Sequence, residues 1–211
     1  TQPESSAASD VYKRQHLIPR LGEIRHRFYI HSSCLPNYAC DGSNGATRDE
    51  EMTTEITEQA LAAARQTWGD ALIAISTAFD QRGIDAARTV AGAALDTAYG
   101  YELGPVLFKP TLANGEQTFR TTRDGALAYF VGHSDDYPDD GGFGIKGWRS
   151  VVSQTAGYLI QGEVAMWMGS VTFTDKNGTV LKVDKSWGYK MDKAGTLRIV
   201  LHHSSLPYQP E

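Results

Sequence analysis

The fold is decided by V-D-K-S-W-G-Y at residues 183–189 and by T-L-R-I-V-L-H-H-S-S-L-P at residues 196–207. Both runs alternate polar residues with β-branched and aromatic ones, a pattern typical of strands with one buried face. The short polar segment D-K-A-G at residues 192–195 joins them and supplies a glycine for a tight turn. The two runs therefore predict a β-hairpin that closes the sheet.

The second strand of this hairpin ends in two adjacent histidines, His202 and His203. Neighbouring side chains on a strand point to opposite faces of the sheet. Strict alternation places His203 on the apolar face with Leu197, Ile199 and Leu201, and His202 on the face of Arg198 and Val200. A polar ring on an apolar face is costly unless it has a partner there, so one imidazole marks a candidate site.

Composition limits the classes of partner and cofactor. The chain has 211 residues, 41% of them hydrophobic, and a net charge of −5. This acidic balance argues against nucleic acid as a partner, and no apolar run is long enough to span a membrane. The two cysteines, Cys34 and Cys40, lie early in the chain, so no disulfide framework can hold the remainder. We expect a cytoplasmic protein without a cofactor.

The chain changes character near Met52. Residues 1–51 lack periodicity and a signal-peptide pattern, and we expect them to be disordered or a non-native upstream segment. A genuine but poorly ordered extension is the alternative. At Met52 the sequence reads M-T-T-E-I-T-E, in which Thr53 or Thr54 can cap a helix. Residues 52–211 are therefore the expected domain.

The order of elements after Met52 predicts an α+β fold. Apolar residues at spacings of three and four predict a long helix over 56–79, followed by an Ala-rich helix over 85–99 and a short one over 122–130. Prolines confine the 101–112 segment to an edge strand, and 116–120 can pair back on it. Four long strands follow at 148–161, 163–175, 179–191 and 196–205. We expect helices packed on one face of a strongly curved antiparallel sheet.

This order of elements resembles the nuclear transport factor two-like, or SnoaL-like, superfamily, near the branch of calcium/calmodulin-dependent protein kinase II association domains. The resemblance rests on Y-G-Y at 99–101, L-F-K-P-T at 107–111, G-A-L-A-Y-F at 125–130, W-G-Y at 187–189 and I-V-L-H-H-S-S-L-P at 199–207. It implies a cone-shaped fold with a pocket at its open end, and homodimers or larger rings built through the outer face of the sheet. The superfamily includes both enzymes and inert association modules, so the fold does not assign the chemistry.

The candidate site residues are those expected to line this pocket. His203 or His202 could act as a general base with Asp184 in support; a hydrogen-bonded histidine pair that anchors the last strand is the structural alternative. Candidate ligand-binding residues are Trp68, Tyr101, Lys109, Arg120, Tyr158 and Trp187. Arg120 would suit an anionic group, because its planar fork matches a carboxylate or phosphate. We expect no metal site, since adjacent histidines on a strand diverge.

The strand over 163–175 indicates how the outer face of the sheet is covered. Met166 and Met168 lie in the phase opposite to Trp167, so both faces of this strand are apolar. A strand that is apolar on both faces is covered on both faces, which favours contact with a second copy of the chain. The leading interpretation is a self-associating, noncatalytic module that binds a small anionic or polar ligand. The alternative is a SnoaL-like isomerase, cyclase or hydrolase with a histidine base.

Overall fold

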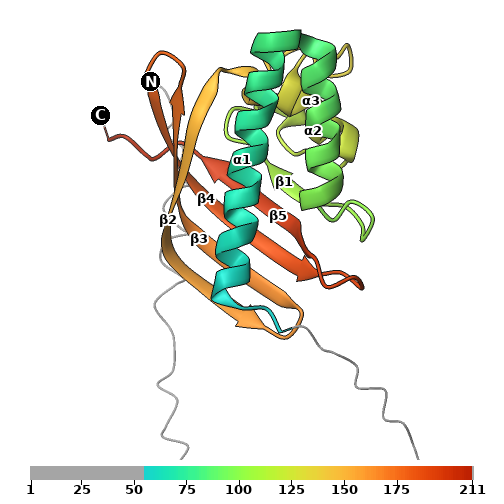
Figure 1. The fold of residues 1–211 in the computed structure, drawn as a ribbon, viewed down its shortest axis with the longest axis vertical. Helices are drawn as coiled ribbons and strands as arrows, with labels where there is room; N and C mark the ends of the chain where they lie inside the picture. Colours follow the sequence, from blue (N-terminus) through green and yellow to red (C-terminus); the bar gives the residue numbers. More distant parts are fainter. Residues whose placement is uncertain (1–54, 211) are drawn as a thin grey trace, which may run out of the picture. The chain divides into compact units, whose positions relative to one another are not determined.

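The computed structural model describes residues 55–210, which form three α-helices and five strands (Figure 1). The α-helices are α1 (Glu58–Arg82), α2 (Ile84–Ala98) and α3 (Arg123–Val131), and two short 3-10 helices, η2 (Gly115–Gln117) and η3 (Phe143–Ile145), lie in the connections. The strands are β1 (Leu107–Lys109), β2 (Trp148–Gln161), β3 (Val164–Asp175), β4 (Val180–Met191) and β5 (Leu197–Ser205). Within this part of the chain, no helix has the length and apolar character needed to cross a membrane.

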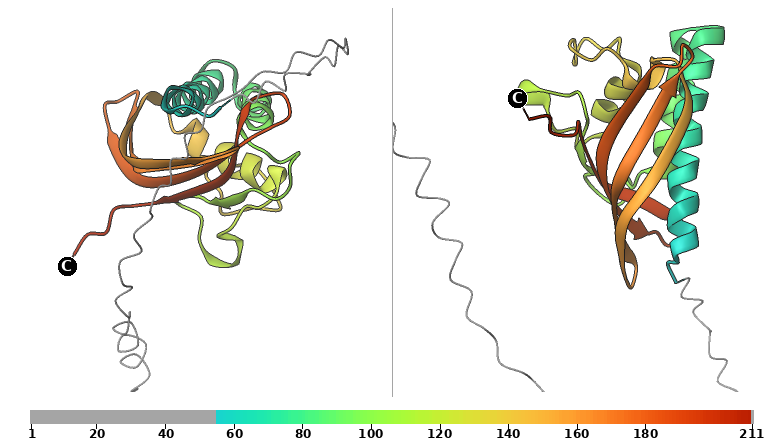
Figure 2. Two further views of the ribbon diagram at one scale, coloured as in Figure 1. Left: turned by 90° about the horizontal axis from the view of Figure 1, so that it is seen from below. Right: turned by 90° about the vertical axis from the view of Figure 1, so that its left-hand side faces the viewer.

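The long helix α1 begins at a side-chain cap and buries one apolar stripe. The Thr57 hydroxyl accepts a hydrogen bond from the Ala60 amide at 3.1 Å, so the cap is Thr57 rather than Thr53 or Thr54. Leu61, Trp68 and Leu72 recur along the helix and are buried. Figure 2 shows α1 lying along one face of the sheet, and this stripe therefore forms the helical side of the core.

The sheet has the strand order β1-β5-β4-β3-β2. The β2–β3, β3–β4 and β4–β5 pairs are antiparallel, whereas the short β1 runs parallel to β5. Side chains on β3 alternate strictly: Ala165 and Trp167 are buried, and Met166 and Met168 are exposed. The predicted alternation of this strand is confirmed.

The α+β class is confirmed, and three details of the expected fold are wrong. The sheet is mixed, because β1 joins it parallel to β5, and it twists without the strong curl expected (Figure 2). The segment over 116–120 contains the end of η2 and no strand, although the Arg120 amide still donates to the Phe108 carbonyl at 2.8 Å. The predictions for residues 1–51, and for a start at Met52, lie outside the described residues.

Candidate active site

A β-bulge decides which histidine of β5 faces the interior. On β4, Gly188 and Tyr189 are adjacent, but their partners on β5 are Leu201 and Ile199, so Val200 is one extra residue. A bulge of this kind shifts the alternation of faces by one residue. Ile199 and His202 are both buried, whereas His203 is exposed. The prediction that His203 shares the face of Ile199 is therefore wrong, and His202 is the inner imidazole.

Aromatic rings surround His202. The register places it between Phe108 on β1 and Trp187 on β4. Phe108 stacks on the imidazole with 4.5 Å between ring centroids, and Trp68 and Trp187 approach it at 5.5 and 5.3 Å. Burial, with Lys185 and His203 as lesser causes, holds the pKa of His202 well below its usual range. The imidazole is therefore neutral at neutral pH.

A chain of hydrogen bonds runs through His202. The Trp68 Nε1–H donates to the Tyr99 hydroxyl oxygen at 2.9 Å, and this hydroxyl lies 2.9 Å from His202 Nδ1. On the other side of the ring, Nε2 lies 2.8 Å from the Lys185 Nζ. The indole can only donate. When Tyr99 donates to Nδ1, the imidazole proton lies on Nε2, and Lys185 must then accept through a neutral amine.

Lys185 extends this chain to two hydroxyl groups. Lys185 is directly opposite Ser204 in the β4–β5 register, and its Nζ donates to the Ser204 Oγ at 3.1 Å. The Ser204 Oγ lies 2.6 Å from the Thr111 Oγ1, just beyond β1. Lys185 is only 4% exposed, and this burial lowers its pKa to about 7. An amine that is half protonated near neutral pH therefore lies among two hydroxyls and an imidazole.

These polar groups line a closed, tightly packed cavity that has no room for a water molecule. Tyr129 on α3 contributes a further hydroxyl, and burial raises the pKa of this phenol, so it stays protonated. The Tyr129 hydroxyl also accepts a hydrogen bond from the Leu112 amide at 3.4 Å. The polar lining residues are Thr111, Tyr129, Lys185, His202 and Ser204, and the apolar ones are Trp68, Phe108, Pro110, Phe130 and Phe143. One side of the cavity is apolar and the other carries hydrogen-bonding groups, and the side chains must move apart before a small ligand can enter.

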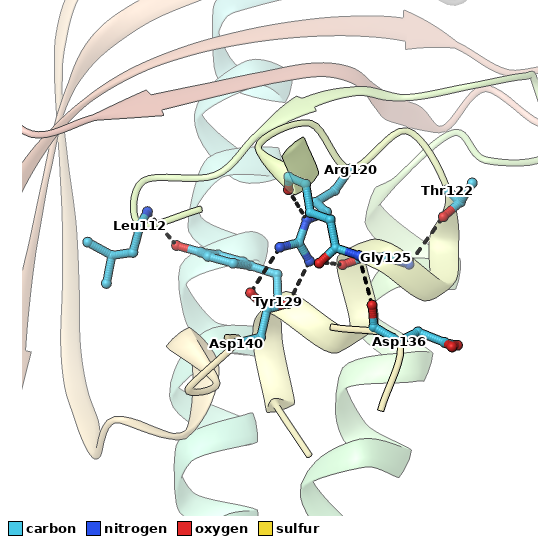
Figure 3. A network of polar contacts seen from close by, with 8 residues as sticks. Leu112, Arg120, Thr122, Gly125, Tyr129, Asp136 and Asp140 are labelled. Atoms are coloured by element: carbon cyan, nitrogen blue, oxygen red, sulfur yellow. Dashed lines mark hydrogen bonds and ion pairs between the residues drawn. The ribbon is translucent and has the colours of Figure 1, made fainter. Parts of the chain in front are cut away.

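Arg120 supports the α3 side of this cavity and is not free to bind an anion. Its guanidinium forms a bidentate pair with Asp140, at 2.5 and 3.0 Å, and both side chains are buried (Figure 3). It also donates to the carbonyl oxygens of Gln117 and Gly125, at 2.6 and 3.3 Å. Arg120 thus ties η2 and the loop before η3 to the first turn of α3, and the next turns of this helix carry Tyr129 (Figure 3). The structure thus places Arg120 as a structural support.

Asp184 and His203 lie on the opposite face of the sheet from His202. Both are exposed, and both line an open groove on this outer face together with Ser205. The groove and the buried cavity are separated by the sheet itself, so Asp184 does not contact the inner imidazole. The strands predicted for Asp184 and His203 are correct, but neither side chain faces the interior as predicted.

The other predicted ligand-binding residues are divided between the cavity and its surroundings. Trp68 and Trp187 pack against His202, and the Lys109 Nζ donates to the Ser204 carbonyl at 3.0 Å. Burial lowers the pKa of Lys109. Tyr101 stacks on Tyr99 outside the cavity, and its hydroxyl has no hydrogen-bond partner among the described residues. Tyr158 is exposed and donates to Glu58 at 2.9 Å, away from the cavity.

Five site residues were not predicted from the sequence: Tyr99, Thr111, Tyr129, Lys185 and Ser204. A signal was present for two of them. Lys185 shares the phase of Val183, Trp187 and Tyr189, which are all buried, so a lysine in this row is unexpected on a core face. Ser204 follows His202 by two residues and shares its face. The other three come from distant segments, and only the fold brings them to the cavity.

The cavity offers no metal-ligand set. Among residues 55–210, no three His, Cys, Asp or Glu side chains gather closely enough to hold an ion. The polar lining consists of one imidazole, one amine and three hydroxyls, whereas protein zinc sites use thiolate, imidazole and carboxylate ligands. The arrangement is suited to chemistry by hydrogen bonding and proton transfer.

A family model, a related protein and a solved structure point to the same family. The family model described as metal-independent carbonic anhydrase matches residues 59–206. The metal-independent carbonic anhydrase of Nostoc sp. strain PCC 7120 is 52% identical over 154 residues, which cover 73% of this chain and 75% of that protein. The crystal structure of a cyanobacterial iota-carbonic anhydrase complexed with bicarbonate is 51% identical, with a TM-score of 0.74, and covers 75% of this chain and 96% of that one.

A solved calcium/calmodulin-dependent protein kinase II association domain from Xanthomonas campestris is also similar, at 21% identity and a TM-score of 0.48, covering 74% of this chain and 91% of that one. The association-domain branch is not the family of this chain, because the matching family model and the 52% identical relative are metal-independent carbonic anhydrases. The leading interpretation, a noncatalytic association or ligand-binding module, is wrong, because the matched family is one of enzymes. The alternative interpretation, a SnoaL-like enzyme, agrees better with the matched family than the noncatalytic module does. The chain belongs to the metal-independent carbonic anhydrase family.

Proposed function

We propose that this protein interconverts carbon dioxide and bicarbonate without a metal ion, in the cavity beside His202. One observation carries the proposal: a buried imidazole, a buried amine and three hydroxyls gather beside aromatic side chains in one closed cavity. Its lining residues include no carboxylate that would repel an anion. The bicarbonate bound to the related cyanobacterial enzyme supports this choice of ligand.

The two sides of the cavity suit the two states of the substrate. Carbon dioxide carries no charge, so the aromatic side chains of Phe108, Phe130 and Phe143 suit it once the cavity opens to admit it. Attack by water forms a new C–O bond and creates a negative charge on the product. Donors that are already oriented toward that charge stabilise it without reorganisation. The hydroxyls of Thr111 and Ser204 lie 2.6 Å apart and can hold the water and then the anion.

The test is the rate of carbon dioxide hydration by the purified chain, measured by stopped flow with and without a metal chelator. We expect the same rate in both. His202→Gln removes the inner imidazole and should lower the rate by about 100-fold or more, the usual effect of losing a group engaged in proton transfer. His203→Gln is the matched control on the outer face, and it should hydrate carbon dioxide at the wild-type rate.

Two results would contradict the proposal. A folded wild-type chain that does not accelerate hydration would refute the function. Loss of activity in His203→Gln, with activity retained in His202→Gln, would move the site to the groove on the outer face.

Binding of bicarbonate gives an independent test of the hydroxyl groups. Ser204→Ala removes one donor to the anion, and losing a hydrogen bond to a charged group costs about 1.5–3 kcal/mol. The dissociation constant, measured by ¹³C nuclear magnetic resonance, should rise by about 10- to 100-fold. Ser205→Ala is the matched control, because Ser205 lines the outer groove. Equal affinities for the two variants would exclude Ser204 from the site.

We also propose that the outer face of the sheet covers that of a second copy in a homodimer. Support comes from the exposed apolar side chains of Leu107, Leu159, Met166 and Met168, which line one open groove on this face. Contiguous apolar surface of this kind usually marks a contact site. Light scattering coupled to size exclusion tests the assembly: Met168→Glu should convert dimer to monomer, and a wild-type monomer at micromolar concentration would refute it.

A further inference from the structure

The Lys185 amine is buried in the cavity without a carboxylate partner. Its Nζ contacts the His202 Nε2 at 2.8 Å and the Ser204 Oγ at 3.1 Å, and none of the ion pairs among the described residues includes it. The nearest rings are Trp68 and Trp187, with centroids 4.8 and 5.4 Å from the nitrogen. Ring faces compensate a buried cation only in part.

The groups that face Lys185 carry no negative charge that could balance an ammonium. His202 on β5 is neutral, and burial keeps the Tyr99 and Tyr129 phenols protonated. Lys109 approaches the same strand through the Ser204 carbonyl and adds a positive charge nearby.

Asp140 and His203 are also unsuitable partners for the Lys185 amine. The Asp140 carboxylate is bound by the two terminal nitrogens of the Arg120 guanidinium. His203 points to the other face of the sheet. A buried, unpaired charge is costly. Burial among these groups therefore favours a neutral amine, and an anion bound beside it would favour the ammonium.

We propose that Lys185 is the proton acceptor of the reaction and that its ammonium then holds bicarbonate as an ion pair. This inference rests on the proposed function. In hydration, the water oxygen forms a bond to the carbon of carbon dioxide, and one C=O electron pair moves onto its oxygen. A water O–H bond breaks, and its proton reaches the Lys185 Nζ, with the Ser204 hydroxyl as the bridging group. Release of bicarbonate and of the proton to solvent restores the neutral amine, and the net products are one bicarbonate and one proton.

The first test needs no variant. Calorimetry of bicarbonate binding to the wild-type chain, in two buffers of different ionisation enthalpy, counts the protons taken up. At about pH 8 we expect uptake of close to one proton per bicarbonate, because the free amine is mostly neutral there. The dissociation constant should rise by about tenfold per pH unit above about pH 7.

Two lysines of β4 provide the variant and its matched control. Lys185→Met keeps an unbranched side chain of similar length but removes the amine, and it should abolish proton uptake and lower the hydration rate by about 100-fold or more. Lys182→Met changes an exposed lysine on the same strand and should keep both properties. Lys185→Arg carries a charge that cannot be lost, so it should also hydrate carbon dioxide slowly and take up no proton.

The outcomes separate this inference from the proposed function. If the wild-type chain hydrates carbon dioxide and binds bicarbonate without proton uptake and without pH dependence, Lys185 is not the acceptor and the function stands. Proton uptake retained in Lys185→Met would assign the proton to His202 and also overturn the inference. A wild-type chain that neither hydrates carbon dioxide nor binds bicarbonate would remove both.

Discussion

Replacing Asp140 with asparagine tests whether the buried ion pair beside α3 supports the site. The Arg120 and Asp140 side chains are 3% and 6% exposed, so water cannot replace the lost carboxylate. Removing one partner of a buried pair costs about 3–5 kcal/mol, because the other charge stays buried and uncompensated. For a domain of this size each kcal/mol lowers the melting temperature by about 2–4 °C. We expect a decrease of about 6–20 °C in Asp140→Asn.

The assay is thermal and urea unfolding followed by circular dichroism, with carbon dioxide hydration measured on the folded variant. Arg120 binds carbonyl groups of η2 and of α3, so its release should also displace Tyr129 and slow the reaction. Asp139→Asn is the matched control, since Asp139 is the exposed neighbour. A loss below about 1 kcal/mol in Asp140→Asn would refute the reasoning and place the pair among weak surface contacts.

Three further changes have defined outcomes. In Gly169→Ala the new Cβ would lie 2.1 Å from a carbonyl oxygen of β2. We therefore expect the free energy of unfolding, measured in urea, to fall by about 1–3 kcal/mol or more. Gly157 has open space around it, so Gly157→Ala should be near neutral. Thr57→Ala should cost about 1 kcal/mol through loss of the α1 cap, and Thr57→Ser should restore it. Burial lowers the pKa of Lys185 to about 7, so above that pH the unfolded chain holds more protons than the folded one. The free energy of unfolding of the wild type should therefore rise with pH relative to that of Lys185→Met. Unfolding at about pH 7 to 9 should show a difference of up to about 1.4 kcal/mol per pH unit; a flat difference would mean that the buried amine stays charged.

The regular elements could be predicted from the sequence, since their signals are local. The predicted strands over 148–161, 163–175, 179–191 and 196–205 match β2–β5 to within one residue, because period-two alternation and glycine turns fix their ends. The three-residue β1 and its parallel pairing could not be predicted. Its partner β5 follows about ninety residues later, and no local pattern specifies the direction of that contact.

The site was predictable only in part, for a similar reason. His202 could be named as one of two candidates, but alternation alone assigned the inner position to its neighbour, because the bulge at Val200 leaves no sign in the amino-acid pattern. Lys185 could have been found as a charge in a buried row. Thr111 and Tyr129 belong to segments that meet β5 only in the folded chain, so their role follows from topology.

The bulge at Val200 divides β5 into two halves with independent phase. The half before it, with Ile199, serves the packing of the interior, and the half after it, with His202 and Ser204, serves the chemistry. Insertion of one more residue between these halves would shift the phase of the second half, so that the cavity received Leu201 and His203 while the core stayed unchanged. Deletion of Val200 would instead remove the bulge and leave His202 opposite Trp187. In a related sequence, the histidine that faces the interior therefore follows from the bulge and from the number of residues after it, and strict alternation from the core isoleucine does not identify it.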